Sequence, residues 1–162
     1  MPRNPKYPLQ TLREHRDHAV DGATADLGVA VRAREVADEQ RRRAEQAQAQ
    51  VEASAEEVRQ GEGRRLAGGE LKVADLARAS EWEHAAAAEA AERGRAVARA
   101  DETLGAARAV EGRARAALAQ RKADLDVVVK DQARFDAGVL RAREASEEEA
   151  ATDAFAARRR EA

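Results

Sequence analysis

The residues of this sequence that come nearest to a chemical site are two histidines near its beginning. His15 and His18 lie three positions apart, with Glu14 and Asp17 beside them. On a helix this spacing places both imidazoles on one face, where they could hold a metal ion together. A zinc-like site needs at least one further ligand from elsewhere in the chain. Two solvated histidines in a charged first turn are the simpler interpretation, so we expect no metal and no cofactor.

The sequence contains no pattern that supplies a nucleophile or a phosphate-binding loop. It has no cysteine and no Gly-x-Ser-x-Gly motif. The glycine-rich segment GEGRRLAGG at 61–69 lacks the preceding strand and the Lys-Ser/Thr ending of a phosphate loop. Carboxylates are abundant, but a helical rod offers no pocket that would shift their pKa values. We therefore predict that the protein is not an enzyme.

Two isolated aromatic residues are better candidates for a function, which would be the binding of another protein. Trp82 is the only tryptophan and stands in the stretch ARASEWEHAAAA, while Phe155 stands between two alanines. Each could be a local plug in the core or an exposed anchor, because tryptophan in particular is enriched at interface hot spots. The sequence leaves both alternatives open.

The composition indicates an elongated helical protein. Aromatic residues make up 2% of the 162 residues and charged residues 37%, while most of the 43% hydrophobic fraction is alanine. Alanine buries little apolar area, so a compact globule would gain little from it. Alanine, arginine, glutamate, glutamine and lysine are strong helix formers, which favours helix over disorder.

The charge pattern excludes several classes of partner. The 29 basic and 31 acidic residues are interspersed, so no basic surface for nucleic acid is expected. No apolar run approaches the length of a membrane span. The opening MPRNPKYPLQ lacks the apolar core of a secretion signal, and we expect a cytoplasmic protein.

The positions of the helix-breaking residues, proline and glycine, predict one elongated coiled-coil domain over 1–162 with two helices. All three prolines lie within the first eight residues, and four of the ten glycines lie within 61–69. We expect the first helix at about 8–60, a glycine-rich turn at about 61–69, and the second helix at about 70–158.

Both helices carry a seven-residue repeat of small and apolar residues, which is typical of a coiled coil. The predicted seam of the first helix contains Ala23, Ala30, Ala37, Ala44, Val51 and Val58, with Val20 and Leu27 continuing into Arg34, Arg41 and Gln48. The predicted seam of the second helix contains Leu76, Glu83, Ala90, Val97, Leu104, Glu111, Leu118, Leu125, Gln132 and Val139 on one row, and Ala79, Ala86, Arg93, Ala100, Ala107, Ala114, Arg121, Val128, Phe135 and Ala142 on the other.

A short turn between two such helices predicts an all-α, long two-helix antiparallel coiled-coil hairpin. The two predicted helices differ in length. The second helix therefore either overhangs the first or has a kink or break before Val97, for which Gly94 is the candidate.

The sequence resembles a known family along nearly its whole length. The opening KYPLQTLREHRDHAVDGATADLGVAVRAREVADEQ is similar to the start of FliJ/YscO-type proteins, in which an aromatic-x-Leu-Gln-x-Leu-x-x-x-Arg pattern opens a long helix. Here the pattern falls on Tyr7, Leu9, Gln10, Leu12 and Arg16. The segment GELKVADLARASEWEHAA resembles the start of the family's second helix, and EEEAATDAFAARRR resembles its charged C-terminal stretch.

The resemblance implies a non-catalytic central stalk of a type III protein export ATPase, in a flagellar or an injectisome system. Such a stalk is a monomeric coiled coil that lies in the cytoplasm at the inner-membrane export apparatus. Its paired termini enter a hexameric export ATPase, and its other end contacts the export gate membrane protein, with export chaperones as further partners. On this basis the ATPase end would use Leu9, Leu12, Arg13, Arg16, Phe155 and Arg158. The turn end would use Leu71, Leu76 and Trp82.

The alternative is a generic structural coiled coil, such as a scaffold or a homodimerising linker. A dimer in solution would favour this alternative, whereas a monomeric hairpin would favour the stalk.

Overall fold

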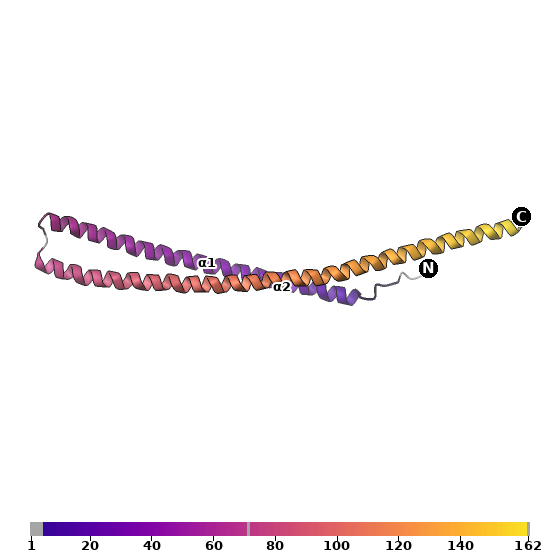
Figure 1. Cartoon of the computed structure of the whole chain (residues 1–162), viewed down its shortest axis with the longest axis horizontal. Coiled ribbons are helices and arrows are strands. Elements are labelled where there is room, and N and C mark those ends of the chain that lie inside the picture. The colour runs from indigo at the N-terminus through magenta and orange to yellow at the C-terminus, as the bar shows by residue number, and fades with distance from the viewer. Residues whose placement is uncertain (1–4, 71, 162) are drawn as a thin grey trace. The chain divides into compact units, whose positions relative to one another are not determined.

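Two long helices make up the computed structural model, which describes residues 5–70 and 72–161 (Figure 1). Helix α1 spans Gln10–Ala67 and helix α2 spans Val73–Glu161. No strand occurs among the described residues. The predicted fold class, an all-α two-helix hairpin, is therefore confirmed.

The contacts divide the chain into two units, each of which contains a part of both helices. The terminal unit consists of Met1–Leu27 with Ala114–Ala162, and the turn unit is Gly28–Arg113. In the turn unit Arg34 pairs with Glu111 and Arg41 with Asp101, so positions rise along α1 as they fall along α2. The helices of this pair are thus antiparallel, while a single domain over 1–162 stays a prediction.

Helix α1 ends at Ala67, two residues before a glycine with a left-handed backbone, and not at the first glycines of the cluster. Gly69 has a φ of 72°, and the amides of Gly69 and Glu70 donate to the carbonyls of Leu66 and Arg65, which is a Schellman motif. The prediction that the first helix ends at Gln60 was wrong, because Gly61 and Gly63 lie inside α1. A single helical glycine costs only about 1 kcal/mol, which the hydrogen bonds of a long helix tolerate.

Helix α2 begins at a capped first turn and continues without a break. The Asp75 carboxylate accepts a hydrogen bond from the amide of Lys72 at 3.0 Å, which satisfies a donor at the helix start. Gly94 lies within the helix, so the predicted break is absent and the overhang accounts for the unequal lengths. In the terminal unit every described side chain from Leu140 to Arg159 is exposed, and α2 runs on beyond the start of α1 (Figure 1).

The predicted seam agrees with the observed burial along most of both helices. Ala30 and Ala37 of α1 and Leu104, Glu111 and Val128 of α2 are buried.

Near the turn one row of the α2 seam is shifted by one residue, while Ala79 and Ala86 of the other predicted row are partly buried. Trp82 is partly buried and faces a groove with Val51, while the predicted seam residues Leu76 and Glu83 are exposed. Covering the indole removes far more apolar area from water than covering a glutamate, which favours the observed register.

Candidate protein-interaction surfaces

The terminal unit is held together by Tyr7, which precedes α1. Its ring lies 5.5 Å from the ring of Phe135, and its hydroxyl donates to the Asp131 carboxylate at 2.6 Å. The pKa of Tyr7 is raised to about 12, first by burial and then by its hydrogen bond to Asp131. Tyr7 therefore fastens the start of the chain to α2. The sequence places Tyr7, its only tyrosine, within the family pattern but does not predict this contact.

Arg13 and Arg16 were predicted to contact a partner, and the structure turns both toward α2. Arg13 donates to the side-chain oxygen of Gln132 at 2.6 Å, and Arg16 donates to the main-chain carbonyl of Asp124. Both arginines are partly buried. Their guanidinium groups hold α1 against α2, and their position in the seven-residue repeat, in line with Val20 and Ala23, was the available signal for this role.

The apolar residues predicted at the same end remain accessible. Leu9 and Leu12 are exposed in the first turn of α1. Phe155 is 68% exposed and Arg158 is exposed, both on the overhanging part of α2. These four side chains are available for a partner, but they lie on two segments between which no contact is observed among the described residues.

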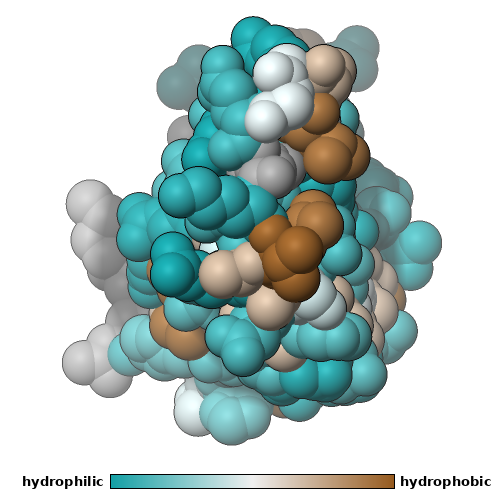
Figure 2. All heavy atoms as spheres, turned by 90° about the vertical axis from the view of Figure 1, so that its left-hand side faces the viewer, coloured by the Kyte–Doolittle hydropathy of each residue, from teal (hydrophilic) through white to brown (hydrophobic). Residues whose placement is uncertain are grey.

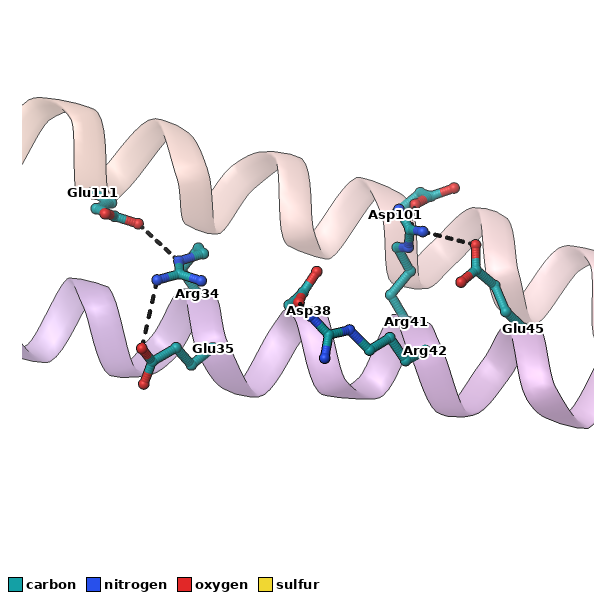
Figure 3. Close-up of polar contacts among 8 residues, drawn as sticks. All are labelled: Arg34, Glu35, Asp38, Arg41, Arg42, Glu45, Asp101 and Glu111. Carbon is teal, nitrogen blue, oxygen red and sulfur yellow. Dashed lines mark hydrogen bonds and ion pairs between the residues drawn. The ribbon is translucent and has the colours of Figure 1, made fainter.

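A polar layer interrupts the seam of the turn unit (Figure 3). Arg34 of α1 donates from Nε to a carboxylate oxygen of Glu111 at 3.1 Å, and the Glu111 side chain is only 8% exposed. Arg34 also lies 3.5 Å from Glu35. A buried carboxylate with a facing guanidinium specifies the pairing of the two helices, because a shifted register would separate the charges.

A second arginine lies one seven-residue repeat further along the same seam row of α1. Arg41 pairs with Glu45 at 2.9 Å, and its Nε is 3.5 Å from Asp101 without a hydrogen bond (Figure 3). The hydrogen bond and charge of Glu45 raise the pKa of Arg41. Of the predicted polar seam positions, Arg34 and Arg41 therefore pair with acidic residues of α2 in the turn unit.

Apolar surface is exposed at the turn end, where brown patches stand out against hydrophilic surroundings (Figure 2). The large apolar residues exposed there are Leu66, Val73 and Leu76. Leu66 and Leu76 line a shallow groove of about 350 Å³ between the helices. Leu76, predicted both in the seam and at a partner contact, is thus accessible, while the predicted Leu71 lies outside the described residues.

Trp82 lines a larger groove of about 450 Å³ between α1 and α2. The walls of this groove include Val51, Ala55, Val58 and Ala86. Small side chains at these positions fill little space, and the indole is only partly buried. Trp82 therefore combines the two alternatives that the sequence left open, because it packs against α1 and still borders an open groove.

The described residues hold no group of three or more histidine, cysteine or acidic side chains that could bind a metal ion. Both histidines of the candidate pair, His15 and His18, are exposed. Within the described part of the chain, neither helix has an apolar stretch long enough to cross a membrane.

No family model, no curated protein and no solved structure matches this chain. The structural class of the protein therefore rests on its own helices: it is a two-helix antiparallel coiled coil.

Proposed function

We propose that this protein is the non-catalytic central stalk of a type III protein export ATPase. Its terminal unit, with the overhanging part of α2, would enter the hexameric ATPase ring at the cytoplasmic face of the inner membrane, and its turn end would contact the export gate. The flagellar and the injectisome systems are equally compatible with the proposal.

The observation that carries the proposal is the division of roles within the opening pattern. Tyr7 and Arg16 of this pattern bind α2, whereas Leu9 and Leu12 of the same pattern stay exposed. One short motif thus both closes the coiled coil and presents apolar side chains beside it. This arrangement suits an end that is inserted into a ring of subunits.

The overhanging part of α2 supports the same role. Beyond Leu140 the described side chains are exposed, and Phe155 is the large apolar residue among them. A single helix is only about 10–12 Å wide, which is narrow enough for a pore between protein subunits.

The apolar turn end supports a second contact. Leu66, Val73 and Leu76 are exposed large apolar side chains at a loop, and clustered surfaces of this kind mark interaction sites. A protein with binding surfaces at both its termini and its turn fits a connector better than a passive spacer.

The test is the hydrolysis rate of the cognate hexameric export ATPase with increasing amounts of the purified chain. We expect stimulation that saturates near one chain per ring. The variant L12D/F155D should lose the stimulation, because each substitution places a carboxylate in the apolar contact. The matched control T11D/A154D adds the same charges at neighbouring exposed positions and should keep it.

A ring whose hydrolysis rate does not change, and which does not co-purify with the chain, would contradict the stalk role. A stable homodimer in the same preparation would then favour a generic scaffold.

A further inference from the structure

One side of the turn unit carries an apolar strip that the hairpin leaves uncovered. Val29 and Val36 of α1 are 59% and 58% exposed, and Val110 of α2 is 46% exposed. Ala33 lies between the first two valines and Ala106 lies one turn before the third, and both alanines are exposed. We call these five residues the valine strip.

The members of the valine strip lie on the same side of the helix pair. Each exposed valine directly precedes a buried seam residue, and these neighbours are Val29–Ala30, Val36–Ala37 and Val110–Glu111. The helices of an antiparallel pair are related by a two-fold axis perpendicular to the plane that contains both. Positions on the same flank of the seam in the two helices therefore lie on one face.

The charged residues on this side are basic from position 29 to 47 of α1 and from 96 to 113 of α2, and Glu92, one repeat before Arg99, is the nearest carboxylate in the same row of α2. In each seven-residue repeat the side comprises the two positions held by Val29 and Ala33, namely 29, 33, 36, 40, 43 and 47 in α1 and 96, 99, 103, 106, 110 and 113 in α2. No carboxylate occupies any of these described positions, and the charged residues there are Arg43, Arg99 and Arg113. The opposite side carries Glu35, Asp38, Glu45 and Asp101.

This pattern is unusual for an isolated two-stranded coiled coil. Positions next to the seam are normally charged, and a wider apolar face is typical of a helix that packs against more than one neighbour. Valine is also a weaker helix former than alanine, glutamate or lysine. Helix propensity therefore does not explain the three exposed valines.

We propose that the valine strip is the docking site for one amphipathic helix of a partner protein. Apolar residues of that helix would lie against the valines, and its acidic residues would meet Arg43, Arg99 and Arg113. Arg43 and Arg99 now pair with Glu39 and Glu92 at 2.9 Å each. Such exposed pairs contribute little to stability, so the guanidinium groups can change partners at low cost.

The charges favour a foreign helix over a second copy of this chain. Two copies that met through the strip would bring the same three arginines together, and like charges oppose such contact. An acidic helix meets no such repulsion. The inference does not depend on the stalk proposal, because the strip belongs to the turn unit and uses none of the residues assigned to the ATPase or the export gate.

The experiment places a photoreactive benzophenone amino acid at Val36 of the full chain in the cell that produces it. The matched control carries the same group at the neighbouring Glu35, which lies on the opposite side of the seam. Cross-linked peptides are sequenced by mass spectrometry. The combined variants V29D/V110D and R43E/R113E are tested in the Val36 background, and circular dichroism verifies that each remains helical.

We expect the Val36 probe to join a segment of another protein with apolar residues at helical spacing and a net negative charge. Each double variant should lower this product about tenfold, because a carboxylate or a reversed charge then faces the bound helix. The inference is overturned if the Glu35 probe gives the same product. It is also overturned by a product with a second copy of this chain, with a basic or non-helical segment, or by no product at Val36.

Discussion

At the scale of single residues, Tyr7 is the clearest case of a side chain with a defined physical task. It lies before the first helix, in the segment that contains the three prolines, yet it is buried against α2 and hydrogen-bonded to Asp131. A spacing argument cannot find this contact, because the residue precedes the seven-residue repeat. Arg13 and Arg16 differ from it in that their positions within the repeat predict that they face α2.

The raised pKa of Tyr7 predicts how the stability of the chain changes with pH, and the ionisation of Tyr7 can be followed by absorbance. Its pKa is raised from 10.0 to about 12, so the folded chain favours the neutral phenol. Below pH 10 the phenol is neutral in both states, and its full contribution to stability is present. Between pH 10 and about 12 the unfolded chain ionises first, so the free energy of unfolding falls as the pH rises. Tyrosinate absorbance in the near ultraviolet should show a midpoint near 12 in the folded chain.

The variant D131N serves as the control for this titration. It removes the carboxylate that accepts from Tyr7, and the midpoint should fall part of the way toward 10, because burial still acts. A midpoint of 10 in the unmodified chain would show that the Tyr7 contact does not form.

At the scale of elements, the helices and most of their seam could be predicted from the sequence. The predicted repeat agrees with the observed burial at Ala30 and Leu104, because both burial and helix propensity favour it. One row of the seam beside the turn could not be predicted, because Trp82 competes with its neighbour Glu83 for the inner position and the bulkier indole occupies it. Exposure of Phe155 was open in the sequence, since it depends on how far α2 outruns α1.

The end of α1 depends on which glycine requires a special backbone. A Cβ added to Gly61 or Gly63 meets no atom within 4 Å, so G61A and G63A should each raise the free energy of unfolding by about 1 kcal/mol. Gly69 has a φ of 72°, and G69A should lower it by about 1 kcal/mol. Urea unfolding followed by circular dichroism measures all three. If G61A instead lowered the free energy of unfolding, Gly61 would lie in the turn and the turn would span 61–69 as the sequence predicts.

The buried polar layer of the turn unit gives a further prediction. In the unmodified chain the Arg34 guanidinium lies 3.1 Å from the Glu111 carboxylate. The variant E111A removes this partner and should lower the free energy of unfolding by about 2 kcal/mol. The double variant R34L/E111L should recover most or all of this loss, because two leucines pack in the seam without a charge to desolvate.

The control for this layer is R42A, which removes the exposed pair of Arg42 with Asp38 and should cost less than about 1 kcal/mol. Equal effects of E111A and R42A would mean that Glu111 is not buried against α1 in solution.

At the scale of the whole molecule, each unit combines an internal polar anchor with apolar side chains left exposed. In the terminal unit the anchor is Tyr7 with Asp131, and Leu9 and Leu12 are exposed. In the turn unit the anchor is Arg34 with Glu111, and the valine strip and the turn end are exposed. Both the stalk proposal and the docking proposal require that these anchors form within one copy of the chain.

The most direct test of this requirement uses the absence of cysteine from the sequence. The variant R34C/E111C is oxidised at low concentration, and its products are sized under denaturing conditions with and without reductant. We predict a disulfide closed within one chain, which migrates as a monomer, and no dimer from R34C alone. A disulfide-linked dimer from R34C would show parallel pairing of two copies, and a purely intermolecular product from the double variant would show antiparallel pairing between copies. Either result would contradict the hairpin.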